Sequence, residues 1–418
     1  MATALQADLK TLQKQYDDYK AAALALNMAR GKPASEQLDM VQEFYFKATA
    51  NHDLTAEDGT DCRNYGAPKG LTELRRLFAG ILEVDPEAVV AQGNSSLEIM
   101  YHIVGDAMTH KTPGADRPWS EVSDRKFLCP APGYDRHFAV TEHFGFELIA
   151  VPMLADGPDM DRVEALCAVD DSIKGIWCVP KYSNPDGITY SAEVCRRLAS
   201  MKAAPDFKIM WDNAYGVHHL YDDPAEQADL SNILALCREA GNEDRVFMLT
   251  SLSKVTFAGG GIGAMATSKA NLDWYMSNAK FRSIGPDKVT QLEQVRLIEA
   301  AGGLPALMSR HAAIIRPKFE ATLEILEHEL GGTGLADWLE PKGGYFISVN
   351  LQPGRAKKVV QMCKEAGVTL TGAGATYPCG NDPADRNIRI APTFPSLAEL
   401  KQAMQIFCTC VKLAAAEA

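Results

Sequence analysis

The residue most able to take part in covalent chemistry is Lys254, in the segment TSLSKVTFAGGGIG. A lysine amine in a desolvated site has a lowered pKa and can form an imine with a carbonyl group. The nearby hydroxyls of Ser251 and Ser253 could donate hydrogen bonds to a phosphate. An ordinary surface lysine beside a flexible loop would also fit this segment. The glycines match neither GxxxxGK[ST] nor GxGxxG, which disfavours a nucleotide-binding loop.

A second candidate site is KIMWDNAYG, an apolar run that ends in Asp212 and continues to Tyr215. Opposite a pyridine ring, a carboxylate keeps the ring nitrogen protonated, so that the ring can accept an electron pair. The phenol of Tyr215 could donate to a ring oxygen. A helix N-cap after a strand is the plainer alternative for Asp212.

Three further motifs carry polar side chains that could bind a ring oxygen, a phosphate or a carboxylate. In CVPKYSNPDG the amide of Asn184 could reach a ring oxygen, although a plain NPDG turn needs no function. In VAQGNSSLEIM the residues Asn94, Ser95 and Ser96 open a helix, which suits either a phosphate or a simple N-cap. In NIRIAPTF, Arg389 could clamp a carboxylate with two hydrogen bonds or form a structural salt bridge.

One cofactor, pyridoxal 5′-phosphate, accounts for all five motifs together. Along the chain they would supply a phosphate cup, a donor to the ring oxygen, a partner for the pyridinium, the imine lysine and a carboxylate clamp. Each motif alone is unspecific, but the ordered set is specific. The sequence therefore predicts an enzyme that uses this cofactor.

These motifs end short apolar runs that alternate with amphipathic helices between about Tyr65 and Ser268. The candidate strands are Lys126–Cys129, Glu147–Val151, Gly175–Pro180, Lys208–Trp211, Arg245–Leu249 and Ile262–Thr267. The alternation predicts an α/β fold with a mainly parallel sheet, whose ligands collect at the carboxyl ends of the strands. The candidate residues should therefore meet at one edge.

After Pro305 the pattern changes to a smaller α+β domain, with a long helix, alternating strands and a final helix. Apolar residues recur at helical spacing from Leu5 to Leu26, which predicts an amphipathic helix that docks on the body of the protein or on a partner subunit. We expect a large cofactor-binding domain over residues 50–305 and a small domain formed by residues 1–49 and 306–418.

Composition narrows the class of protein. The formal net charge of the 418 residues is −12, which disfavours nucleic acid and anionic membranes as partners. The charged N-terminus is not a signal peptide, and no apolar run approaches the roughly 20 residues that span a bilayer. The ten cysteines form no CxxC pairs, so we expect reduced thiols, no metal site and a cytoplasmic location.

The ordered motifs resemble those of the fold-type I pyridoxal-phosphate enzymes, class I aminotransferases, from Leu26 almost to the end of the chain. The resemblance implies a PLP-dependent transferase fold, a homodimer with active sites at its interface, and Lys254 as both Schiff-base lysine and acid/base. It implies that Asp212 pairs with the pyridinium, that Asn184 and Tyr215 donate to the ring oxygen, and that Tyr134 of PAPGYDRH stacks on the ring.

The same resemblance assigns the phosphate and the α-carboxylate of the substrate. Arg389 would bind the carboxylate, and PKGGYF at residues 341–346 would form a small-domain strand. The phosphate would be held by Asn94, Ser95, Ser96, Ser251, Ser253 and Tyr65, the last from the other subunit. One departure is that Gly261 stands where the family usually has a phosphate-binding arginine. Lys288 of the neighbouring subunit is a candidate replacement.

Within the family, RGKPASEQLDM, GNSSL, PGYDRHF and SLSKVTFAGGG resemble a divergent group of aspartate aminotransferases. This implies L-aspartate and 2-oxoglutarate as substrates and requires a second cation for the distal carboxylate. Arg282 of the partner subunit, or Lys32 beside Gly31 in ARGKP, could supply it, although both could be solvated surface charges. An aminotransferase for aromatic or neutral amino acids and a β-lyase remain alternatives. A non-catalytic ligand-sensing regulator is disfavoured, because no segment is left for a DNA-binding module.

Overall fold

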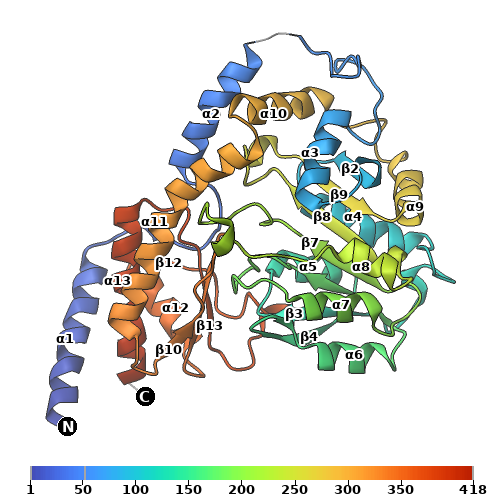
Figure 1. Cartoon of the computed structure of the whole chain (residues 1–418). Helices are drawn as coiled ribbons and strands as arrows, with labels where there is room; N and C mark the ends of the chain where they lie inside the picture. Colours follow the sequence, from blue (N-terminus) through green and yellow to red (C-terminus); the bar gives the residue numbers. More distant parts are fainter. Residues whose placement is uncertain (1, 51–52, 417–418) are drawn as a thin grey trace.

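The computed structural model describes residues 2–50 and 53–416 of the chain. Its centre is an eight-stranded sheet with the order β2-β9-β8-β7-β6-β3-β4-β5 (Figure 1). The strands are β2 (Val89–Gln92), β3 (Lys126–Ala131), β4 (Glu147–Leu154), β5 (Gly157–Pro158), β6 (Ile173–Cys178), β7 (Lys208–Asp212), β8 (Val246–Ser251) and β9 (Gly263–Thr267). The run from β8 to β4 is parallel, whereas β9 runs antiparallel to both of its neighbours. The prediction of a mainly parallel α/β sheet is confirmed.

Helices cover both faces of this sheet, so its strands are buried on both sides. In β7, Ile209 and Trp211 pack into the apolar cluster on one face, whereas Met210 packs into the cluster on the other. The first face carries α3 (Thr72–Leu82), α6 (Met160–Cys167), α7 (Ala192–Ser200) and α8 (Ile233–Glu239). The second carries α4 (Ser96–Thr109), α5 (Asp135–His143) and α9 (Lys269–Ala279). The alternation along β7 therefore directs Asp212 away from its neighbours Trp211 and Asn213.

The first part of the chain and most of its C-terminal part build a second layered unit at the left of Figure 1. Its antiparallel sheet has the order β10-β11-β13, and a short parallel pair joins β1 to β12. The strands are β1 (Leu26–Asn27), β10 (Ala336–Trp338), β11 (Ile347–Leu351), β12 (Val368–Thr369) and β13 (Asn387–Ile390). The helices are α1 (Ala2–Ala21), α11 (Leu304–Leu330), α12 (Ala356–Glu365) and α13 (Leu397–Ala416). This unit carries Arg389, on β13.

The N-terminal segment passes from one apolar cluster to the other. Tyr16 of α1 and Leu26 pack with the C-terminal elements, and α1 docks on α13 of its own chain. The side chains of residues 2–8, including Leu5, lie outside the described part of the structure. Val41 and Phe44 of α2 (Ser35–Thr49) instead join the cluster of the large sheet, where α2 packs on α10 (Lys288–Ala300). The division of the chain into domains at residues 50 and 305 stays a prediction.

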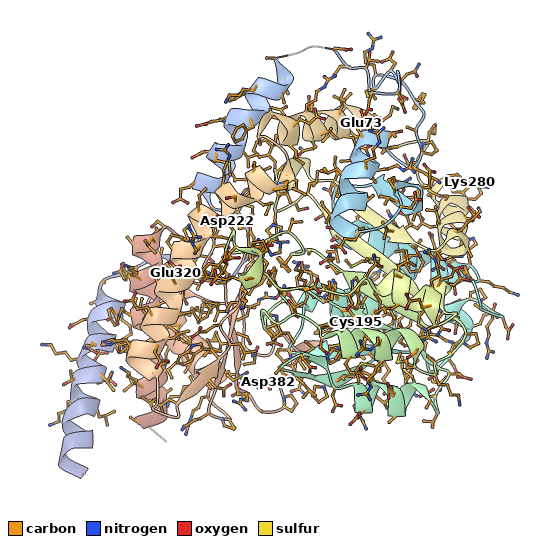
Figure 2. The ribbon with its side chains drawn as sticks, in the orientation of Figure 1. Glu73, Cys195, Asp222, Lys280, Glu320 and Asp382 are labelled. Carbon is orange, nitrogen blue, oxygen red and sulfur yellow. The ribbon has the colours of Figure 1, made fainter. Side chains whose placement is uncertain are left out.

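Side chains fill the space between the sheets and their helices (Figure 2). All ten cysteines are free thiols and nine of them are buried, including Cys195 on α7, which Figure 2 labels. Within residues 2–50 and 53–416, no helix has the length and apolar character to cross a membrane. Over the same residues, no three His, Cys, Asp or Glu side chains are grouped to hold a metal ion.

Candidate active site

A cavity of about 210 Å³ lies at the carboxyl ends of β6, β7 and β8, and it gathers most of the predicted site residues. Asp212 ends β7, Ser251 ends β8, and Asn184 follows β6 after a short loop. The predicted residues that line the cavity are Ser95, Ser96, Tyr134, Asn184, Asp212, Tyr215, Ser251, Ser253 and Lys254. Because parallel strands end at the same edge of a sheet, residues far apart in sequence converge there.

Lys254 provides a buried amine in this cavity. Burial lowers the pKa of Lys254, and the nearby charge of Asp212 opposes that shift only in part. The Nζ atom lies 5.1 Å from the centroid of the Tyr215 ring. A lowered pKa leaves a larger share of the amine uncharged and nucleophilic near neutral pH.

Asp212 presents one unpaired carboxyl oxygen beside the cavity. His137 Nε2 lies 2.9 Å from Asp212 Oδ2, and the His137 ring stacks on Trp177 at a centroid distance of 4.7 Å. Asp212 Oδ1 is buried and has no hydrogen-bond partner in the described part of the chain. An unpaired buried acceptor is costly unless a ligand supplies a donor. His137 was not among the residues predicted from the sequence, although its place three residues after Tyr134, in the first turn of α5, was a usable signal.

One end of the cavity is suited to a phosphate. Ser95 caps α4, because its hydroxyl accepts a hydrogen bond from the Glu98 amide at 3.3 Å. This N-cap leaves the hydroxyl proton and the free amides of the first helical turn available to an anion. Ser251 Oγ donates to Ser253 Oγ at 3.2 Å on the facing side. The donor set is therefore neutral.

The packing around Gly261 leaves no room for the arginine that the resemblance led us to expect at this position. A Cβ atom added at Gly261 would lie 2.7 Å from the carbonyl oxygen of Asn94 and 2.9 Å from Ser253 Oγ. Both distances are below ordinary van der Waals contact. No side chain fits there unless one of the two segments that form the phosphate end moves.

The hydrogen bonds of Asn184 orient its amide. Arg389 Nη1 donates to Asn184 Oδ1 at 3.1 Å, which leaves the NH₂ group of Asn184 free to donate elsewhere. Burial raises the pKa of Tyr215 well above its usual value, so its phenol keeps the proton that it could donate. Burial also raises the pKa of Tyr134 to about 12. All three side chains therefore meet the cavity as neutral groups.

Arg389 lies at the boundary between the large sheet and the smaller one. Its Nη1 also donates to Asp135 Oδ1 at 3.0 Å, and its guanidinium lies 5.0 Å from the centroid of the Phe346 ring. Its Nε is buried without a hydrogen-bond partner among the described residues. Gly31 packs on the same ring, since an added Cβ would lie within 2.7 Å of Phe346 Cε1. The guanidinium keeps unused donor capacity for an incoming carboxylate.

Tyr65 is not brought to the cavity of its own chain. Its side chain is 77% exposed, and the residues on either side of it are held by Lys288. The buried amine of Lys288 donates to the carbonyls of Asn64 and Gly66, the latter at 3.3 Å. Lys288 therefore supports the loop that presents Tyr65, so it is not a free cation for a phosphate.

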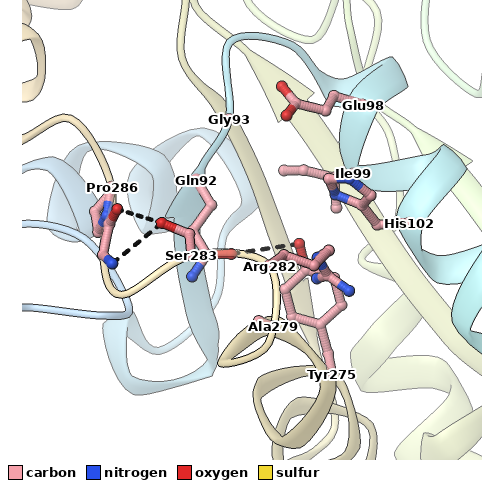
Figure 3. Close-up of a pocket in the computed structure, with 11 residues that line it drawn as sticks. Gln92, Gly93, Glu98, Ile99, His102, Tyr275, Ala279, Arg282, Ser283 and Pro286 are labelled. Atoms are coloured by element: carbon pink, nitrogen blue, oxygen red, sulfur yellow. Dashed lines mark hydrogen bonds between the residues drawn. The ribbon is translucent and has the colours of Figure 1, made fainter.

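The two candidate cations for a distal carboxylate also lie apart from the cavity. Arg282 forms an ion pair with Asp106 and lines a separate hollow of about 210 Å³ with His102 and Tyr275 (Figure 3). Lys32 is exposed, and its amine sits 3.9 Å from the centroid of the Phe394 ring. A role of Arg282 in the neighbouring subunit remains a prediction.

A buried carboxyl close to the site makes the stability of the protein depend on pH. Burial raises the pKa of Asp186 to about 7, and a hydrogen bond with Ser348 opposes this shift. The native chain therefore binds this proton more tightly than the unfolded chain, whose aspartates have pKa values of about 3.9. The contribution of Asp186 to stability falls as the pH rises from about 4 to about 7 and is constant above that range.

The variant Asp186→Asn should escape this loss. Between pH 5 and pH 8, the thermal midpoint of the unmodified chain should fall by about 4 °C relative to the variant. Thermal unfolding of both cofactor-free proteins at the two pH values measures the difference. Midpoints that shift in parallel would contradict the assignment.

These groups fit the parts of pyridoxal phosphate. The unpaired Asp212 Oδ1 matches a protonated pyridine nitrogen, and the buried amine of Lys254 matches the aldehyde. The α4 N-terminus and the serine hydroxyls match the phosphate. The chemistry of this donor set is therefore consistent with the cofactor that the sequence predicts.

Comparison with known proteins gives a consistent result. The family model described as aspartate amino-transferase matches residues 1–418. The chain is 46% identical to an aspartate aminotransferase of Corynebacterium glutamicum, over 97% of this chain and 93% of that protein. The crystal structure of an aspartate transaminase from C. glutamicum matches with a TM-score of 0.94 and 45% identity, covering 100% of this chain and 97% of that one. LysN of Thermus thermophilus, an alpha-aminoadipate aminotransferase, has the same fold, with a TM-score of 0.75 and 21% identity over 94% of each chain.

Proposed function

Because the chain belongs to the aspartate amino-transferase family and is an aminotransferase, we propose that it uses pyridoxal 5′-phosphate to exchange the amino group of L-aspartate for the oxo group of 2-oxoglutarate. The observation that carries the cofactor proposal is a single cavity that holds both the buried amine of Lys254 and the unpaired oxygen of Asp212. The aspartate proposal rests on the name of the relative from C. glutamicum.

When bound, pyridoxal phosphate supplies an aldehyde that takes up the amino group and a ring that stores the electron pair released at the substrate Cα. Lys254 would hold the cofactor covalently through its amine, and once displaced by the substrate amine it would carry the Cα proton. Asp212 would keep the ring nitrogen protonated. Asn184 and Tyr215 would donate to the ring oxygen, and Tyr134 would cover one face of the ring.

Neutral donors would hold the phosphate group in place of an arginine. In our proposal these are the α4 amides and the residues Asn94, Ser95, Ser96, Ser251 and Ser253. Tyr65 would reach the same phosphate from the partner subunit of a homodimer, which fits its exposed position on a supported loop. Gly31 would keep Phe346 close beneath Arg389.

Arg389 would bind the α-carboxylate of the substrate with two parallel hydrogen bonds. The variant Arg389→Lys keeps the charge but loses this fork. We expect the KM for L-aspartate to rise about 10- to 150-fold, the equivalent of a charged hydrogen bond of about 1.5–3 kcal/mol, with a smaller change in kcat. Steady-state kinetics measure the two constants. A KM within threefold of the original value would contradict this role.

The substrate proposal requires a second cation for the distal carboxylate. Arg282 of the partner subunit or Lys32 would fill this role. The separate variants Arg282→Met and Lys32→Met distinguish the two. Only the variant of the residue that binds the distal carboxylate should lose activity with aspartate, while it keeps its low activity with alanine as amino donor.

We propose that the homodimer is located in the cytoplasm.

A panel of amino donors with 2-oxoglutarate as acceptor tests the function. Aspartate should form glutamate fastest, and it should bleach the visible band of the bound cofactor when no acceptor is present. Faster turnover of aromatic or neutral donors would replace the substrate proposal. Product formation without an acceptor would indicate a β-lyase. Full biological function of the Lys254→Ala variant would favour a non-catalytic regulator.

A further inference from the structure

A network of buried polar side chains packs against the Lys254 segment. Gln37 on α2, His311 on α11 and Tyr345 before β11 have exposed fractions of 0%, 1% and 1%. Gln37 Nε2 lies 2.9 Å from His311 Nδ1 and donates to the Tyr345 hydroxyl at 3.2 Å. His311 Nε2 lies 2.9 Å from the carbonyl oxygen of Val255, the residue after Lys254.

Only one assignment of protons satisfies all of these contacts. A carbonyl oxygen accepts only, so His311 Nε2 must carry the hydrogen. Burial lowers the pKa of His311, which keeps the ring neutral and makes its Nδ1 an acceptor for the Gln37 amide. Gln37 Oε1 in turn accepts from the Ala34 amide at 3.0 Å, which fixes the orientation of the side-chain amide. The network therefore has a direction, from Ala34 to Val255.

The other end of the network reaches the groups that would bind substrate. Tyr345 precedes Phe346, whose ring contacts Gly31 and lies 5.0 Å from the guanidinium of Arg389. Gln37 accepts a hydrogen bond from the amide of Ala34, which lies two residues after Lys32. A path of contacts and chain neighbours therefore runs from Arg389 through Phe346, Tyr345, Gln37 and His311 to the Val255 carbonyl, one residue after the lysine.

We propose that His311 and Gln37 are positioning residues that hold the Lys254 backbone in register with Arg389. The inference rests on the proposed role of Lys254 in binding the cofactor. The proposal is supported by hydrogen bonds to two consecutive backbone carbonyls. His311 donates to the carbonyl of Val255, and the carbonyl of Lys254 accepts from Nε2 of the buried His218 at 3.4 Å. Imidazole rings on both carbonyls hold the backbone from which the Lys254 side chain extends.

Two substitutions at one position separate a positioning role from simple packing. His311→Phe keeps the ring but removes both hydrogen bonds, whereas His311→Gln keeps a donor that can reach the Val255 carbonyl. We expect His311→Phe to lower kcat about tenfold with little change in the KM for the amino donor, because loss of a hydrogen bond of about 1.4 kcal/mol corresponds to a factor of ten. His311→Gln should recover most of that loss.

Amide hydrogen exchange of the full-length protein without cofactor gives a readout that does not depend on activity. In His311→Phe, the peptide that covers residues 252–256 should exchange about tenfold faster, while a peptide from β7 should exchange at the original rate. If His311→Phe cannot be obtained folded, Gln37→Met should change kcat and the exchange rate in the same direction but by a smaller factor. Unchanged exchange and kcat, or equal impairment in the Phe and Gln variants, would overturn the inference.

Failure of this inference can be told apart from failure of the proposed function. Borohydride reduction of the unmodified protein should fix the cofactor on Lys254. Labelling of Lys254 together with no effect of the His311 variants would reject only the network. Absence of labelling in the unmodified protein would reject the role of Lys254 itself.

Discussion

Replacement of Lys254 with alanine is expected to lower amino transfer by at least about 10⁴-fold, the upper end of what a positioned acid–base group contributes. Lys254 is the only amine among the described residues that line the cavity, so no neighbour can take over its proton transfer. Initial rates with L-aspartate and 2-oxoglutarate measure the loss. The thermal midpoint without cofactor should not fall, because the variant removes a buried amine whose pKa is lowered by desolvation.

Lys208 provides an internal control for this chemistry. Burial lowers its pKa to about 8, so it is also a desolvated lysine. However, its amine donates to the carbonyl oxygens of Asp244 at 2.7 Å and Pro113 at 3.2 Å, outside the cavity. After borohydride reduction, peptide mapping should therefore find the cofactor on Lys254 and not on Lys208. Equal labelling of both lysines would mean that desolvation alone, without the cavity, selects the amine.

Most of the sheet could be predicted because buried parallel strands leave a strong local signal. The runs Lys126–Cys129 and Lys208–Trp211 correspond to β3 and β7 within two residues. Such strands are apolar on both faces and end sharply in polar turns. The strand order could not be predicted in this way. Insertion of β9 between β2 and β8, antiparallel to both, depends on contacts between segments far apart in the chain.

The site shows the same division between local and distant information. Asp212, Lys254 and Asn184 follow directly from polar residues at strand ends. Gln37 and His311 could not be found, because they lie 274 positions apart in the sequence and only the fold brings them together. Tyr65 and Arg282 are limited in another way, since their proposed roles need a second copy of the chain.

Replacement of Asp212 with asparagine is expected to separate stability from activity. The carboxyl oxygen Oδ1 is buried and has no hydrogen-bond partner among the described residues, so in the cofactor-free chain this oxygen carries a desolvation cost that no contact of its own compensates. An asparagine oxygen can still accept from His137, which now meets Oδ2 at 2.9 Å. Thermal unfolding of the cofactor-free variant should therefore show an unchanged or higher midpoint, as expected when a functional group is held at the expense of stability.

Activity should change in the opposite direction. Without the carboxylate, the ring nitrogen of the bound cofactor would lose a buried charge partner, a loss of about 3–5 kcal/mol or roughly 10²–10⁴-fold in kcat. Asp186→Asn is the matched control, because it makes the same substitution at another buried carboxyl and should keep kcat near the original value. An Asp212→Asn variant with a kcat within threefold of the original would show that Asp212 does not face the ring nitrogen. A lowered midpoint for the cofactor-free variant would show instead that the carboxylate stabilises the fold.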